Sequence, residues 1–251
     1  MTTRSLISAA ALTVFCVSSQ PSLNAGSPAR SVNNPTGTAT VTGVVRFEGQ
    51  VPKPKTLNMA ADPNCAKLHR TPVLQQDVLT NGEGELQNVV VFIADGLSAE
   101  TTEAPSQPVE IEQKGCTYQP HVVAMRADQK LEIVNNDPTS HNVHPAPGIN
   151  REWNKAEPPG TKAEGTFSRE EIAIPIKCNI HPWMQAYVAV FKHPYFAVTG
   201  KNGGFDLRNL PPGTYTIKAW HEKLGTSMQK VTVAANENKA INFVFKTHPS
   251  P

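Results

Sequence analysis

The sequence predicts an all-β protein whose strands are spaced as in a sandwich or a barrel. Two observations carry this prediction. Short segments rich in β-branched residues recur along the chain and are separated by Asp, Asn, Pro or Gly. No long stretch shows helical periodicity. The length of 251 residues allows one or two domains with an ample core.

Composition excludes several classes of protein. Lys and Arg number 23 against 21 for Asp and Glu, so a net charge of +2 leaves no basic face large enough for nucleic acid. The hydrophobic fraction of 39% and the 22 prolines speak against a membrane bundle and a coiled coil. With 4 cysteines, the chain is no disulfide-dense miniprotein either.

The first 25 residues are predicted to be an export signal. Arg4 precedes an apolar run over residues 6–17, and small residues near Ala25 offer a cleavage site before Gly26. An uncleaved membrane anchor is the alternative, although the run is shorter than the roughly 20 residues that span a bilayer. We therefore expect a periplasmic or secreted protein without membrane attachment after cleavage. Residues 26–38 are polar and are expected to form a flexible leader.

A first domain is expected over residues 39–192. Alternating or continuous apolar residues predict its strands, which are placed at 40–47, 88–93, 108–111, 121–126, 130–134 and 185–191. The segment 148–162 is polar and contains prolines, so it is expected to be a surface loop.

A second domain is expected over residues 193–248. Asn-Gly-Gly at 202–204 predicts a hairpin, and Pro-Pro-Gly at 211–213 predicts a turn before a further strand. The stretch GGFDLRNLPPGTYTIKAW from Gly203 to Trp220 resembles the carboxypeptidase regulatory-like, transthyretin-like β-sandwich family, whose modules are usually non-catalytic. Residues 40–47 resemble the opening strand of that module, so insertion of the first domain into the second stays open.

The segment with the most chemical information runs Cys-Asn-Ile-His-Pro-Trp-Met from Cys178 to Met184. It offers a thiolate, an imidazole and a thioether within seven residues, directly before a predicted strand. Soft sulfur ligands with imidazole suit copper, and two His with one Cys and a distant Met make a blue-copper site. His141 lies 37 positions upstream of Cys178 and can supply the missing imidazole.

This ligand pattern resembles the cupredoxin family, and its loop resembles the short loop of amicyanins. The resemblance implies a Greek-key β-sandwich with one type 1 copper ion held by His141, Cys178, His181 and Met184. Asn142 follows the first histidine as in plastocyanins, and it is expected to tie that strand to the ligand loop. The resemblance also implies that His181 reaches solvent within an apolar rim formed by Pro182 and Trp183, and that electrons cross there.

The other histidines are weaker candidates. His144 competes with His141, but residues three apart on a strand face opposite sides, so both are not expected to bind one ion. A second metal site with His144, His193 or His221 is a further alternative.

Three cysteines remain after the export signal. Cys65 and Cys116 lie in turn contexts without ligand spacing, so a disulfide between them is the leading interpretation in an exported protein. Cys65 with His69 as half of another metal site is the alternative.

The predicted function is an exported, non-enzymatic electron carrier. Four protein ligands leave copper without a position for substrate, which suits outer-sphere transfer. Lys177 and Asn179 flank the copper Cys where the cupredoxin domains of copper oxidases and nitrite reductases have a His. A redox protein such as a c-type cytochrome or a dehydrogenase is the expected partner. Copper storage or delivery, and a scaffold with a vestigial site, stay as alternatives; the sequence does not indicate an oligomeric state.

Overall fold

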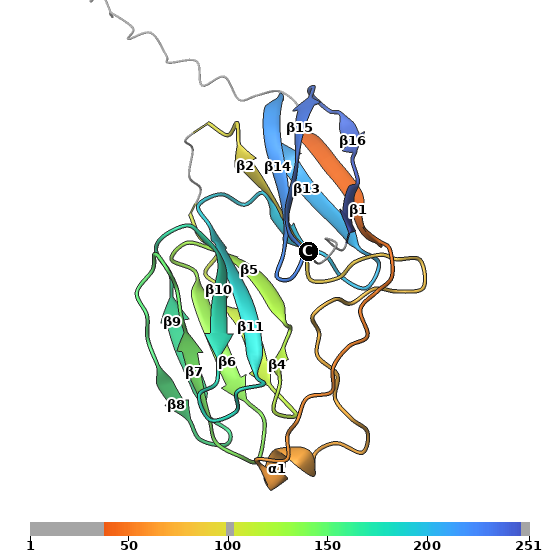
Figure 1. Ribbon diagram of the computed structural model, residues 1–251. Coiled ribbons are helices and arrows are strands. Elements are labelled where there is room, and N and C mark those ends of the chain that lie inside the picture. Colours follow the sequence, from red (N-terminus) through yellow and green to blue (C-terminus); the bar gives the residue numbers. More distant parts are fainter. Residues whose placement is uncertain (1–37, 99–102, 247–251) are drawn as a thin grey trace, which may run out of the picture. The chain divides into compact units, whose positions relative to one another are not determined.

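The structure is a computed structural model that describes residues 38–98 and 103–246 (Figure 1). The prediction of an all-β fold is confirmed, because these residues form 17 strands and one short helix, α1 (Pro63–Ala66). No helix among them is long and apolar enough to cross a membrane. The predicted export signal and all but the last residue of the predicted leader lie outside the described residues.

One set of strands forms two sheets that share a core. The first sheet has the order β5 (Val122–Arg126), β11 (Gln185–Phe191), β10 (Glu171–Lys177), β7 (His141–Pro145) and β8 (Lys155–Glu157). The second has the order β4 (Tyr118–Gln119), β3 (Val109–Gln113), β6 (Lys130–Asn135) and β9 (Lys162–Thr166). Ile133 from one sheet and Ile176 from the other are fully buried in one cluster. Each such side chain contributes about 1.5–3 kcal/mol by leaving water.

The remaining strands form a second pair of sheets. In one sheet, β1 (Ala39–Glu48) pairs with β13 (Gly204–Leu210), β16 (Asn238–Ala240) and β17 (Phe243–Lys246). The other has the order β12 (Phe196–Val198), β2 (Val90–Asp95), β14 (Gly213–His221) and β15 (Gly225–Val233). Val91, Ile217 and Phe243 belong to their common core.

The predicted domain boundaries require a correction. Strands β1 and β2 fall within the predicted first domain of residues 39–192, yet both pair with strands of the second. The strands of the first sandwich, β3 to β11, therefore follow β2 and precede β12, so they are inserted into the second sandwich. The apolar runs 40–47 and 88–93 identify strands correctly, but the pattern of a strand does not say which partner it pairs with.

The predicted loop at 148–162 is wrong in part, because it contains β8 and the first residue of β9. Glu157 is expected to be exposed in this polar segment, but it is fully buried and pairs with His141 on β7. Strands β7, β9 and β10 also lack a predicted counterpart, because each mixes charged or Pro residues with its apolar ones.

A long connection between β1 and β2 carries the helix α1. Asp62 is its N-cap, and its side chain accepts a hydrogen bond from the Asn64 amide. Cys65 of α1 forms a disulfide with Cys116, which confirms the predicted pairing across 51 residues. The disulfide ties this connection to the turn between β3 and β4.

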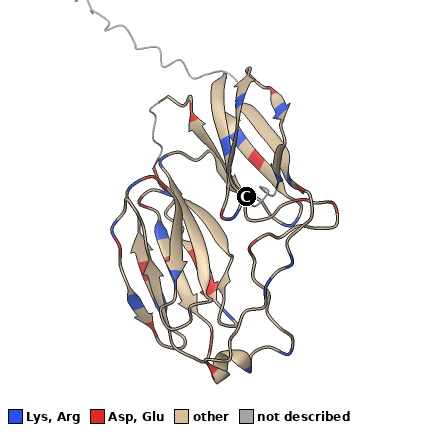
Figure 2. Cartoon of the chain, viewed as in Figure 1, with Lys and Arg blue, Asp and Glu red and all other residues tan. Residues whose placement is uncertain are grey.

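Acidic and basic residues are interspersed along the chain. In Figure 2 neither colour forms a continuous tract over the strands in view. This distribution agrees with the near-neutral composition.

Candidate metal centre

The four predicted ligands lie at one end of the first sandwich. His141 opens β7, and Cys178, His181 and Met184 lie in the turn that joins the antiparallel strands β10 and β11. The turn is held by the Met184 amide, which donates to the His181 carbonyl at 2.9 Å. All four side chains are buried, with exposed fractions of 1–3%.

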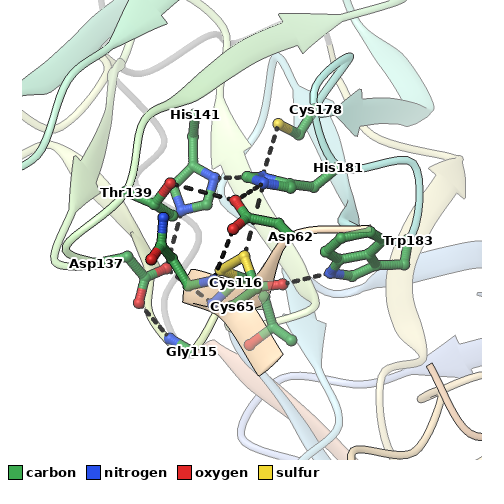
Figure 3. The surroundings of a disulfide bond; sticks show 12 residues. Asp62, Cys65, Gly115, Cys116, Asp137, Thr139, His141, Cys178, His181 and Trp183 are labelled. Atoms are coloured by element: carbon green, nitrogen blue, oxygen red, sulfur yellow. Dashed lines mark hydrogen bonds and ion pairs between the residues drawn. A yellow bond between two sulfur atoms is a disulfide. The ribbon is translucent and has the colours of Figure 1, made fainter. Parts of the chain in front are cut away.

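The ring nitrogens of the two histidines approach the thiol closely (Figure 3). Nδ1 of His141 and Nδ1 of His181 are 2.8 Å apart, and the Cys178 Sγ lies 3.7 Å from the latter. One ligand atom from each of His141, Cys178 and His181 lies within 4.8 Å of the other two. A thiolate and two imidazoles with a buried Met nearby are the donor set that suits copper, so these residues fit the ion that the sequence predicts.

His144 points elsewhere. Its Nδ1 lies 3.0 Å from Asn179 Oδ1 and its Nε2 lies 2.5 Å from Glu152 Oε1, on the outside of the strand. The geometry therefore brings His141, and not His144, to the cysteine. Asn142 lies where it is expected, because its Oδ1 accepts hydrogen bonds from the Cys178 thiol at 3.5 Å and from the Asn179 amide at 2.7 Å.

Sequence reasoning missed two carboxylates that back the imidazoles. Asp137 Oδ2 lies 2.9 Å from His141 Nε2, and Asp62 Oδ2 lies 2.9 Å from His181 Nε2 (Figure 3). The position of Asp137 four residues before His141 is a signal that could have identified it. Asp62 lies 119 residues from His181, and no local pattern connects the two.

These contacts fix the protonation of the metal-free site. An ionised carboxylate only accepts, so both Nε2 atoms carry protons. Burial alone would lower the pKa of His141, but its hydrogen bonds to Asp137 and Cys178 outweigh burial and raise that pKa to about 9. Burial alone would raise the pKa of Cys178, but the hydrogen bond with His141 leads the effects that bring it below its ordinary value. The raised pKa favours a proton on His141 Nδ1, and this proton would lie between the Nδ1 atoms of the two histidines.

The expectation that His181 reaches solvent is wrong. Its exposed fraction is 1%, because Asp62 and the disulfide cover its outer edge. Cys65 Sγ lies 3.6 Å from Nε2 of the ring. Trp183 packs against the ring at 5.0 Å between centroids and donates to the Cys116 carbonyl, so it belongs to the covering and not to an open rim. Pro182 is exposed.

A second buried cluster lies behind the site and was also missed. Glu157 Oε1 accepts from the Ala163 amide at 2.6 Å, but Glu157 Oε2 and Gln113 Oε1 lack partners. Burial raises the pKa of Glu157 to about 7. Tyr118 completes the cluster by donating toward the Asn142 and Lys177 carbonyls.

The alternative metal sites gain no support. Cys65 is held in the disulfide, and His69 Nε2 lies 2.8 Å from the Gly115 carbonyl. Within residues 38–98 and 103–246, no cluster of three potential ligands includes His144, His193 or His221. Burial lowers the pKa of both His193 and His221 to about 4, as for neutral core histidines.

Comparison with known proteins identifies one region. Residues 181–246 match the carboxypeptidase regulatory-like domain. The match begins inside the ligand loop and covers strands β11 to β17, but it does not reach β1 and β2, which the structure adds to the same sandwich. No match was found among curated proteins.

Solved structures that resemble parts of the chain include copper proteins. The Cu-containing nitrite reductase from Thermus scotoductus SA-01 is 18% identical with a TM-score of 0.32, over 39% of this chain and 25% of that one. An oxidised amicyanin mutant is 15% identical with a TM-score of 0.31, over 40% of this chain and 97% of that one. A purple cupredoxin from Nitrosopumilus maritimus is 19% identical with a TM-score of 0.29, over 32% and 97%. This chain thus spans about a quarter of the nitrite reductase.

Proposed function

We propose that the protein binds one copper ion through His141, Cys178, His181 and Met184 and carries single electrons between redox proteins. The observation that carries this proposal is that the Cys178 thiol and the Nδ1 atoms of His141 and His181 lie buried within 4.8 Å of one another, where β7 begins beside the turn that also holds the buried Met184. Bound copper would supply a one-electron couple. The expected location is the periplasm or the outside of the cell, and c-type cytochromes or dehydrogenases are the proposed partners.

The chain's own residues hold and shield the site. Cys178 and His181 are fixed by the turn between two paired strands, and His141 is fixed by Asp137, so little ligand movement accompanies a change of charge. Exposed fractions of 3% or less keep water from the ligands. A site with four protein ligands has no place for substrate, which favours a carrier over an enzyme.

The same burial argues against copper delivery, which needs ligands that a recipient protein can reach. None of the four ligands is exposed, and the disulfide fastens the covering over His181. Electron transfer needs no such access, because the electron crosses without exchange of ligands.

The test is the visible spectrum of copper-loaded protein. We expect an intense Cu(II)–thiolate band that Cys178→Ser abolishes while the protein stays folded. His141→Ala should remove the band, and His144→Ala, the matched control three residues away, should retain it. An unchanged spectrum for Cys178→Ser contradicts the copper site, and the reverse pattern for the histidines contradicts the ligand choice. Reversible one-electron reduction of the wild-type protein then tests the carrier role.

A further inference from the structure

Each of the two imidazoles at the proposed copper site has a carboxylate on its far side. Asp137 Oδ2 and Asp62 Oδ2 both lie 2.9 Å from the Nε2 atom of their histidine. The two Nδ1 atoms lie 2.8 Å apart on the opposite side of the rings, and His181 Nδ1 is 3.7 Å from the Cys178 thiol. The two Asp–His pairs come from unrelated parts of the chain, since Asp137 follows β6 and Asp62 caps α1.

Each carboxylate is held in place by further hydrogen bonds. Asp137 accepts from the Gly115 amide at 2.6 Å and from the Cys116 amide at 2.8 Å. Asp62 accepts from the Asn64 amide at 2.7 Å and from Thr139 Oγ1 at 3.3 Å.

The disulfide joins the two arrangements. Cys65 lies in the helix that Asp62 caps, and the Cys116 amide donates to Asp137 (Figure 3). One covalent link therefore holds both carboxylates near the site. This shared anchor distinguishes the pair from two chance surface contacts.

The pair has two physical consequences. A carboxylate that accepts Nε2–H fixes the tautomer, so Nδ1 keeps its lone pair for the ion, and it makes the imidazole a stronger donor. It also adds negative charge beside the ion. With one thiolate and two carboxylates, the local sum is −1 for Cu(II) and −2 for Cu(I). Asp137 has a side-chain exposure of 3% and Asp62 of 19%, so solvent screens these charges incompletely.

We propose that Asp62 and Asp137 are positioning residues that stabilise the oxidised over the reduced copper site and so set a low reduction potential. The inference rests on the proposed function. It implies that the electron donor is a strong one-electron reductant, which gives one electron to the Cu(II) protein; the Cu(I) protein then passes that electron to an acceptor.

The test compares reduction potentials of the copper-loaded, full-length protein and its variants. Asp62→Asn and Asp137→Asn keep an oxygen acceptor and remove the charge. We expect each to raise the ratio of Cu(I) to Cu(II) affinity at least tenfold, which is about 59 mV for a one-electron couple. Glu152→Gln is the matched control, because Glu152 makes the same contact to His144, which is not a ligand. It should change the ratio less than twofold.

The outcomes separate this inference from the proposed function. If the wild-type protein lacks a reversible copper couple, the function is wrong and the inference falls with it. If the couple is reversible and Asp62→Asn shifts the ratio less than twofold, the inference alone is wrong. The Asp62→Asn variant tests the inference even if Asp137→Asn fails to fold, because Asp62 lies in a partly exposed connection and not in a strand.

Proton NMR of the diamagnetic Cu(I) form provides a second measurement. Two slowly exchanging imidazole N–H resonances are expected, one lost in Asp62→Ala and the other in Asp137→Ala. Retention of both resonances in Asp62→Ala would contradict the pairing of that residue with His181.

Discussion

Glu157 offers the most direct test of the electrostatics inside the first sandwich. Its side chain is fully buried, and one carboxyl oxygen accepts a hydrogen bond from the Ala163 amide. Burial favours the protonated, uncharged form of Glu157, and the hydrogen bonds from the Ala163 amide and the Gln113 side chain offset burial only in part. Glu157→Gln keeps the accepting oxygen and adds an uncharged amide donor.

The expected change in the free energy of unfolding follows from the shift in the Glu157 pKa. Burial raises the pKa of Glu157 from 4.5 to about 7 in the folded protein. That difference corresponds to about 3 kcal/mol, since one pH unit is worth about 1.36 kcal/mol. Because the folded state holds the proton more tightly than the unfolded state, wild-type stability falls as the pH rises above 4.5, and the full loss is reached above about pH 7. The Gln variant lacks this loss.

The assay is urea unfolding of the metal-free protein between pH 4 and about pH 8.5. The stability of Glu157→Gln relative to wild type should rise by about 3 kcal/mol across this range, or by roughly 6–12 °C in Tm for a protein of this size. Glu110→Gln, on the exposed side of β3, is the control and should give a flat difference. A flat difference for Glu157→Gln as well would refute the argument that the buried carboxyl holds a proton.

Three further predictions concern the site and its covering. Cys65→Ser with Cys116→Ser should lower the free energy of unfolding by about 4 kcal/mol, because the link closes a loop across 51 residues; urea unfolding measures this loss, and an unchanged midpoint contradicts it. Copper binding at pH 7 should release protons, because His141, with its pKa raised to about 9, must give up Nδ1–H and Cys178 must bind as a thiolate; pH-stat titration should show this release fall as the pH rises past about 9, and release that is independent of pH contradicts it. Ile180→Asp, at a position 53% exposed on the ligand loop, should slow electron exchange with a partner more than it perturbs the spectrum; stopped-flow mixing measures the rate, and unchanged exchange excludes docking at this loop.

The parts of the site that the sequence predicts are local. Cys178, His181 and Met184 lie in one short turn, and their spacing alone places them together. His141 lies on a different strand, β7, which has no predicted counterpart, and only the resemblance of His141-Asn142 to the plastocyanin motif selects it. The two-residue period of a strand indicates only that His141 and His144 do not bind the same ion, and the resemblance to cupredoxins selects His141; the outward contacts of His144 agree with that choice.

The parts that the sequence does not predict depend on distant pairing. Asp62 reaches His181 because a disulfide across 51 residues holds α1 beside the ligand loop, and nothing in the local pattern encodes that position. For β1, the resemblance of residues 40–47 to the opening strand of the second module already offered the observed pairing as an alternative, whereas β2 has a clear apolar pattern but partners more than 100 residues away in the chain. The sequence places Glu157 in a loop, because its burial depends on pairing with His141 on another strand, which the local pattern does not encode.

The covering of His181 changes how an electron would leave the site. The resemblance to cupredoxins places the exit at the imidazole edge, but here that edge faces a carboxylate and a disulfide, and the ring is 1% exposed. The same turn presents Ile180 and Pro182 to solvent, next to the buried Cys178. A connection that protects one ligand therefore leaves Ile180 and Pro182 as exposed residues of the ligand loop. Because Asp62 belongs to that connection, the segment that closes the imidazole edge also places a negative charge beside the proposed copper ion.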